Sequence, residues 1–196
     1  MTASMATNER HPLAPFTPDG ATLLMLGSFP PPRARWSMDF FYPNWINDMW
    51  RIVGLLFFDD RKYFEVSEEK RFDKERIALF CSTKGLALYD AATEVRRLKE
   101  NASDKFLEVA EPTDLKALLE RLPHCRAIVT TGQKATDLVV AQAGCAEPSI
   151  GGYVEATIGD RTVRIWRMPS TSRAYPLALD KKAEAYLLMF RSLGRL

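Results

Sequence analysis

Three short segments of this 196-residue chain carry residue types suited to binding a planar, polar ligand. The first is the turn Gly27, Ser28 and Phe29, which three prolines follow at residues 30–32. A glycine lets a ligand approach the backbone closely, and the prolines stiffen the turn and so fix the orientation of Ser28 and Phe29. A purely structural turn has the same composition, so this segment alone leaves both interpretations open.

The second segment is rich in aromatic residues and runs over residues 40–50. Aromatic residues at this density usually form core, but here they lie in a loop and the first turn of a predicted helix. They alternate with polar residues, among them Asn47 and Asp48. An aromatic face from Phe41 or Tyr42, beside amide and carboxylate groups, suits a nucleobase.

The third segment, residues 168–176, follows the last predicted strand. Its small hydroxyl residues and backbone amides suit phosphate oxygens, and Arg173 adds a positive charge. The residues we expect to contact a nucleic-acid backbone are Ser170, Thr171, Ser172, Arg173 and, from another loop, Lys134. The alternative is that the segment only caps and precedes the last helix.

These segments need a scaffold, and the chain alternates strand and helix patterns. Apolar runs predict strands at residues 21–26, 85–90 and 127–131, and a hairpin at 153–167. Helical spacing is found at residues 44–58, 67–84, 112–122, 133–143 and 179–193. Strands separated by helices predict an α/β fold with a largely parallel sheet and helices on both faces. In such sheets ligands bind at the carboxyl ends of the strands, where the three segments lie.

Composition excludes several classes of protein. The net charge is +2, so a nucleic-acid partner requires positive charge gathered on one face. No apolar run approaches the roughly 18 residues of a membrane span, and residues 1–18 lack an apolar signal core. We therefore expect one cytoplasmic domain over residues 1–196, without a membrane partner and with a loosely ordered lead at 1–18.

Cysteine and histidine usage excludes other kinds of site. The three cysteines are an odd number without close pairing, which favours reduced thiols. His11 and His124 lie far apart in predicted loops, and no metal-ligand spacing occurs. We expect no metal and no other cofactor.

In order and spacing, the segments resemble the uracil-DNA glycosylase superfamily. The turn at Gly27 looks like that family's Gly-x-x-Pro catalytic-water loop, and residues 169–172 look like its second motif. Tyr42 and Pro43, followed by Asn47 and Trp50, are similar to the Tyr/Phe…Pro…Asn-x-Phe-Trp signature of the mismatch-specific and hypoxanthine branches. The strand ending at Asp90 and the turn at 132–135 match as well.

The resemblance implies a three-layer sandwich with a short, mostly parallel four-stranded central sheet. It also implies a monofunctional DNA glycosylase of base-excision repair, which hydrolyses the N-glycosidic bond of a flipped-out uracil or hypoxanthine. Tyr42, or its neighbour Phe41, would stack on the base, and Asn47 would orient the attacking water. Asp90 stands where the family recognises the base, beside Gly27, Ser28 and Phe29. Asp48 is a candidate general base if it lines the pocket.

Three departures from the family pattern qualify this hypothesis. Phe29 stands where active branches have Asp or Asn, and Met168 stands where the most active branch has His. Asp90 replaces an Asn, and an ionised carboxylate only accepts hydrogen bonds. We therefore expect slow catalysis, or a preference for bases that leave easily. We also expect a monomer. The alternatives are a non-catalytic nucleic-acid or nucleotide binder on the same scaffold, and a small-molecule enzyme of another doubly wound family.

Overall fold

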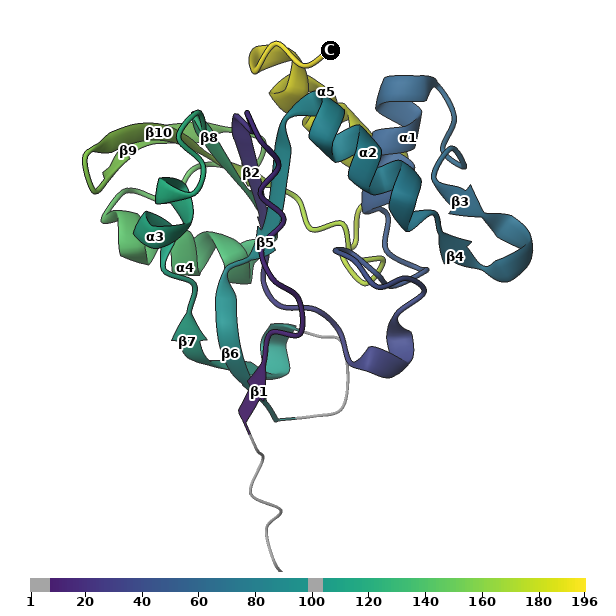
Figure 1. Ribbon diagram of the computed structural model, residues 1–196, viewed down its shortest axis with the longest axis horizontal. Coiled ribbons are helices and arrows are strands. Elements are labelled where there is room, and N and C mark those ends of the chain that lie inside the picture. Colours follow the sequence, from purple (N-terminus) through teal and green to yellow (C-terminus); the bar gives the residue numbers. More distant parts are fainter. Residues whose placement is uncertain (1–7, 99–103) are drawn as a thin grey trace, which may run out of the picture.

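A five-stranded mixed sheet forms the centre of the computed structural model, which describes residues 8–98 and 104–196 (Figure 1). Across the sheet the strands are β5 (Leu86–Asp90), β2 (Leu23–Gly27), β8 (Ala127–Thr131), β10 (Arg161–Met168) and β9 (Tyr153–Ile158). The first four are parallel, and β9 is antiparallel to β10. Every residue of β2, β5 and β8 is buried, as the apolar runs predict for strands covered on both faces.

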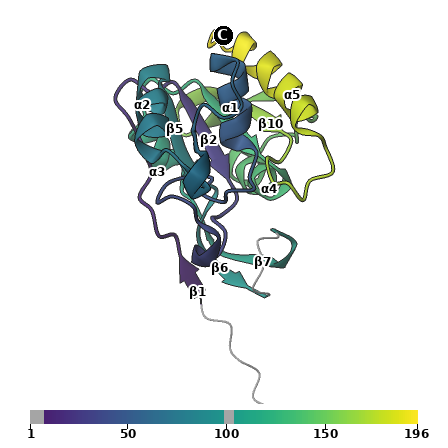
Figure 2. The same cartoon turned by 90° about the vertical axis from the view of Figure 1, so that its right-hand side faces the viewer.

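Helices cover both faces of this sheet (Figures 1 and 2). On one side lie α1 (Met49–Phe58), α2 (Lys74–Lys84) and α5 (Leu179–Ser192); on the other lie α3 (Leu115–Glu120) and α4 (Gln133–Ala143). The predicted α/β class is therefore confirmed. The predicted four-stranded sheet is wrong, because the hairpin's first strand, β9, extends the sheet at its edge.

A second, antiparallel sheet lies beyond the carboxyl ends of the parallel strands (Figure 1). It consists of β1 (Asn8–Arg10), β6 (Ala92–Arg97) and β7 (Leu107–Pro112), and β6 leaves β5 almost directly. The expected loose lead thus does not extend over residues 8–18. The sequence did not suggest this sheet because its strands carry many charged residues and little apolar alternation.

Three helices begin later than expected: α1 begins at Met49, and side-chain caps set the starts of α2 and α3. The carboxylate of Asp73 accepts a hydrogen bond from the Arg76 amide at 3.0 Å, so α2 begins at Lys74. Asp114 caps α3 in the same way. The residues before α2 instead form the short strands β3 (Glu65–Val66) and β4 (Arg71–Phe72) around a 3-10 turn, η2 (Ser67–Glu69). Further 3-10 turns are η1 (Arg33–Arg35) and η3 (Asp104–Phe106).

No helix within the described part of the chain is both long and apolar enough to cross a bilayer.

Candidate active site

A cleft of about 660 Å³ opens at the carboxyl ends of the parallel strands. All three segments singled out in the sequence line it, together with the first residues of α4. The loops after β2, β8 and β10 meet there because the carboxyl ends of parallel strands lie along one edge of a sheet. The sequence therefore located the cleft correctly.

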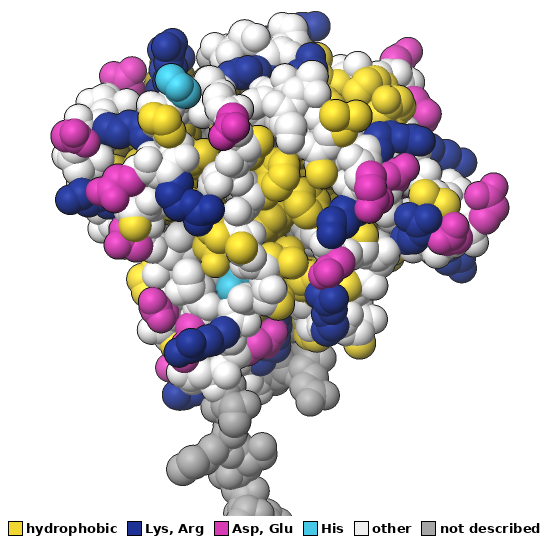
Figure 3. Space-filling model, viewed as in Figure 1, with side chains coloured by type: hydrophobic (Ala, Val, Ile, Leu, Met, Phe, Trp, Pro, Cys, Tyr) yellow, Lys and Arg dark blue, Asp and Glu magenta, His cyan; other side chains and the backbone are white. Residues whose placement is uncertain are grey.

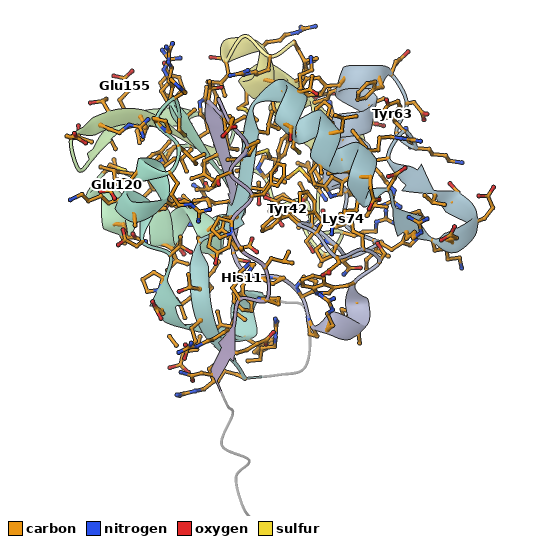
Figure 4. All side chains as sticks on the ribbon, viewed as in Figure 1. His11, Tyr42, Tyr63, Lys74, Glu120 and Glu155 are labelled. Carbon is orange, nitrogen blue, oxygen red and sulfur yellow. The ribbon has the colours of Figure 1, made fainter. Side chains whose placement is uncertain are left out.

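Tyr42 contributes an aromatic ring to this cleft (Figure 4). Its hydroxyl lies 3.1 Å from the Thr131 hydroxyl, and its ring meets Trp50 edge-to-face with centroids 6.0 Å apart. Its backbone is left-handed, with a φ of 52°, a strained conformation for a residue with a side chain. Burial, and then the charge of Asp90, raise the pKa of Tyr42 well above its usual range. The ring is thus held in place and its phenol stays neutral.

Asn47 lines the same cleft, just before α1. Its Oδ1 accepts a hydrogen bond from the Met49 amide at 2.9 Å, and its carbonyl accepts one from Arg51 at 3.0 Å. The first contact closes a turn just before α1 and satisfies the amide of that helix's first residue. The Nδ2 of Asn47 makes no hydrogen bond within the described residues, so this turn orients the side-chain amide and still leaves donors for a ligand or water.

Asp48 does not line the cleft, although it is the next residue. Its buried carboxylate accepts from Lys182 Nζ at 2.9 Å and from Arg173 Nη2 at 3.2 Å. Lys182 also donates to the Ser172 carbonyl at 2.8 Å. The condition on which Asp48 was a candidate general base is therefore not met, and the ion pair instead ties α1, α5 and the third segment together.

Asp90 ends β5 and lines the cleft with a side chain that is 11% exposed. One carboxylate oxygen, Oδ2, lies 2.8 Å from His11 Nε2. The Asp90 carbonyl accepts from the Thr113 hydroxyl at 2.6 Å. A Cβ on Gly27 would lie 2.4 Å from Asp90 Oδ1, so only glycine at this position leaves room for the carboxylate. Gly27 thus shapes the site without lining the cleft.

The apolar wall of the cleft comes from the first two segments. Phe29 and Phe41 are both buried and both line it, as does Ser28. The Phe29 ring meets the His11 ring edge-to-face at 5.3 Å, and the Phe41 ring lies 6.2 Å from it. An apolar wall beside a single carboxylate is typical of a pocket that binds a planar polar molecule.

The third segment forms two hydroxyl-stabilised turns at the rim. The Ser170 hydroxyl oxygen accepts from the Ser172 amide at 3.2 Å, and the Ser172 hydroxyl oxygen accepts from the Ala174 amide at 3.3 Å. Both oxygens are therefore used as acceptors, which leaves the O–H groups to donate. Thr171 is buried, and its carbonyl accepts from the Asp48 amide at 2.9 Å. Phosphate oxygens accept hydrogen bonds only, so they match these two hydroxyls.

Comparison with known proteins finds similarity among solved structures. No protein-family model matches the sequence, and no curated protein sequence matches it. The solution NMR structure of a "putative Uracil DNA glycosylase" from Methanosarcina acetivorans matches with a TM-score of 0.60. The match covers 94% of this chain and 99% of that one, at 20% sequence identity. This chain has a uracil-DNA glycosylase-like fold.

The uracil-DNA glycosylase-like fold brings three further residues to the site that the sequence did not single out. His11 reaches Asp90 from the amino-terminal strand, Thr131 bonds Tyr42, and Lys182 bonds Asp48. Each contacts a residue far away in the sequence, so no local pattern marks it. For Lys182 the sequence does carry a signal, because this lysine falls on the apolar face of the amphipathic α5, where it is buried.

Charges around the cleft are unequal in sign. Of the described residues that line it, Asp90 alone carries a carboxylate, whereas the cations are Arg35, Lys105, Lys134 and Arg173. Lys134 also donates to the Leu107 carbonyl at 3.0 Å. Elsewhere on the face shown in Figure 3, basic and acidic side chains alternate around a hydrophobic centre. Among the described residues that line the cleft, basic side chains therefore outnumber acidic ones.

Two further basic residues belong to the second sheet. Arg97 donates to Glu9 at 2.7 Å and to the Pro30 carbonyl at 2.5 Å, and Arg96 lies 3.7 Å from Glu108. The described residues also contain no cluster of side chains suited to a metal ion.

Proposed function

We propose that this protein is a monofunctional DNA glycosylase that hydrolyses the N-glycosidic bond of an everted, deaminated base, uracil or hypoxanthine, in base-excision repair. One observation supports it above the others: Tyr42 and Asn47 of the second segment line one cleft with Asp90, which ends β5 far away in the sequence. The uracil-DNA glycosylase-like fold supplies the scaffold on which the cleft is built.

The base would stack on the ring of Tyr42 after leaving the duplex. Such stacking contributes about 1–3 kcal/mol and does not depend on which base it is. The apolar wall of Phe29 and Phe41 would exclude water from the other edges of the base. Asp90, as an acceptor, would take an N–H of the base, and both uracil and hypoxanthine present one next to a carbonyl.

Asn47 would act on water. When the bond between the base and the sugar breaks, its electron pair leaves with the base and an oxocarbenium-like sugar remains. A water molecule then adds to this cation and loses its proton to the departing base or to solvent. Asn47 cannot deprotonate water, but its free Nδ2 would hold the oxygen close to the reacting carbon.

Catalysis by this site would be slow. Met168 is buried and offers no hydrogen-bond donor to the departing base, and Phe29 offers no acid or amide side chain to the water. The negative charge that develops on the base is therefore stabilised less than in a site with such a donor.

The DNA backbone would lie along the third segment. Ser170 and Ser172 would donate their hydroxyls to phosphate oxygens, and Arg173 and Lys134 would supply positive charge at the rim. These contacts fix the position of the strand and do not select the base.

Base release from oligonucleotides carrying uracil, hypoxanthine or xanthine tests the proposal. We expect Asn47→Ala to abolish release and Asp90→Asn to change the preferred base, because an amide both donates and accepts. Asp160→Asn, in the exposed turn between β9 and β10, is the matched control for the charge change. Unchanged turnover in both cleft variants would contradict the placement of the pocket.

A non-catalytic nucleic-acid binder remains the second candidate, because the one carboxylate of the described cleft lining is already engaged by His11. DNA binding with steep salt dependence, without release of any base, would favour it.

A further inference from the structure

His11 has a buried side chain (Figure 4) and contacts two residues that line the cleft, Asp90 and Phe29. Only 2% of its side chain is exposed, and Tyr89 and Phe29 flank its ring at centroid distances of 4.6 and 5.3 Å. Nε2 lies 2.8 Å from Asp90 Oδ2. Nδ1 lies 2.9 Å from the Leu13 carbonyl oxygen and 3.1 Å from the Leu13 amide nitrogen. Both ring nitrogens therefore have partners.

This arrangement lets His11 donate to Asp90 in either charge state. When the ring is neutral, Nδ1 accepts from the Leu13 amide and the proton on Nε2 goes to the carboxylate. When the ring is protonated, Nδ1 donates to the Leu13 carbonyl and Nε2 still donates to Asp90. One carboxylate oxygen is thus always occupied, and the other, Oδ1, lies against the bare Cα of Gly27.

His11 directly follows β1, and hydrogen bonds through β6 connect β1 to the first cleft loop. β1 pairs with β6, with Glu9 opposite Val95, and the His11 amide donates to the Thr93 carbonyl at 2.8 Å. Arg97 of β6 bonds both Glu9 and the Pro30 carbonyl. The second sheet therefore carries His11 to the end of β5, where Asp90 stands.

We propose that His11 is a positioning residue of the base pocket, which holds Asp90 as a hydrogen-bond acceptor and so restricts the pocket to bases that present an N–H there. This inference rests on the proposed function. Without His11 the carboxylate would lose its fixed orientation within an apolar wall, and discrimination between bases that differ at this edge would fall. The effect belongs to selection of the base, because His11 reaches the cleft through Asp90.

Base selection by variants of the two histidines tests this role. His11→Leu removes the donor, whereas His11→Gln keeps one, since the Gln Nε2 can reach the place of the imidazole Nε2. Adenine carries a lone pair at the ring nitrogen where hypoxanthine has its N–H, so we expect His11→Leu to lower the ratio of kcat/KM between hypoxanthine and adenine oligonucleotides by roughly tenfold or more. His11→Gln should keep the ratio within about threefold of the parent. His124→Leu, at the exposed second histidine, should leave it unchanged. A parental ratio in His11→Leu would overturn the inference.

A spectroscopic measurement on the free protein keeps the test independent of catalysis and of folding losses in His11→Leu. Long-range ¹H–¹⁵N spectra of the two imidazole rings should show that Asp90→Asn shifts the His11 signals and leaves those of His124 in place. Unshifted His11 signals would overturn the inference.

If no oligonucleotide releases a base, the proposed function is wrong, and selection is then measured with free hypoxanthine and free adenine. Binding that shifts the His11 signals in the parent and loses its preference in His11→Leu supports the positioning role. No shift with either base overturns it.

Discussion

Gly27 is a residue at which one added methyl group would displace a carboxylate of the site. A Cβ there would overlap Asp90 Oδ1, at 2.4 Å, so Gly27→Ala forces the carboxylate to turn away from His11. We expect kcat/KM for base release to fall about tenfold or more, because a charge-assisted hydrogen bond is lost. Base-release kinetics beside urea denaturation would measure this.

The control for that variant is Gly144→Ala. Gly144 ends α4 with a φ of 60° and has open space where a Cβ would lie. It should cost about 1–2 kcal/mol of stability through backbone strain and leave base release intact. Full activity in Gly27→Ala would show that the orientation of Asp90 does not matter.

Tyr42 separates the contribution of the ring from that of the hydroxyl. Tyr42→Ala removes the surface on which the base would stack, and we expect kcat/KM to fall by about 5- to 150-fold, equivalent to about 1–3 kcal/mol. Tyr42→Phe keeps the ring and loses only the contact with Thr131, so its loss should be much smaller. Equal losses in the two variants would indicate that Tyr42 acts through its hydroxyl and not by stacking.

At the scale of elements, α5 holds the third segment in place. Tyr186 donates to the Pro169 carbonyl at 3.0 Å, and Lys182 binds both Asp48 and the Ser172 carbonyl. α5 therefore connects the turns at Ser170 and Ser172 to the start of α1, where Asn47 lies. The two predicted segments owe their relative position to this helix.

Lys182→Met tests that connection. Among the described residues, the buried Asp48 carboxylate then keeps the half-exposed Arg173 as its charged partner. Removing one member of a buried ion pair lowers the free energy of unfolding by about 3–5 kcal/mol. Urea denaturation should show a loss of this size. Lys181→Met, at the exposed neighbour that pairs with Glu184, should cost less than about 1 kcal/mol. Similar losses in both would contradict the role of the buried pair.

At the scale of the whole molecule, local charge should govern affinity for DNA. Each phosphate contact neutralised by a basic side chain makes log K fall more steeply with log salt concentration, by about one unit of slope. We expect Arg35→Gln, at the exposed rim of the cleft, to reduce the slope by about one. Arg126→Gln, exposed at the amino end of β8, should not change it. Fluorescence anisotropy from 50 to 300 mM salt (roughly the range in which such slopes are measured) would decide between them.

Stability should fall in alkaline solution because two tyrosines are buried. Burial raises the pKa of Tyr186 and of Tyr42 well above their usual value, whereas in the unfolded chain both ionise near pH 10. Above about pH 10 the unfolded chain binds fewer protons than the folded one, so the free energy of unfolding decreases as pH rises. Below that pH the two states bind the same phenolic protons and the effect is absent.

Each tyrosine contributes up to about 1.4 kcal/mol per pH unit to this decrease. Urea denaturation between pH 9 and 11.5 (roughly one unit either side of the ordinary phenol pKa) should therefore show a smaller slope for Tyr186→Phe than for the parent. The buried thiols of Cys81 and Cys125, the latter with its pKa raised to about 11 by burial, add to the slope equally in both proteins. Identical slopes would contradict the prediction.

The sequence by itself determined the parallel strands and the position of the cleft. β2, β5 and β8 are short apolar runs, which only a sheet covered on both faces can bury, and the loops after such strands must meet at one edge. The loops that carry Tyr42, Asn47 and Asp90 meet at that edge for this reason, whereas the resemblance to the uracil-DNA glycosylase superfamily singled out these three side chains.

Only the tertiary structure decided which neighbouring side chain faces the cleft and what holds it. Asn47 lines the cleft while Asp48 pairs with Lys182, a residue 134 positions away, and Asp90 is held by His11, which lies 79 positions before it. The second sheet that delivers His11 is built from charged strands without apolar alternation. Hydrophobic patterning shows which surfaces are buried together, but the pairing of a buried polar group with a distant partner leaves no periodic trace in the sequence.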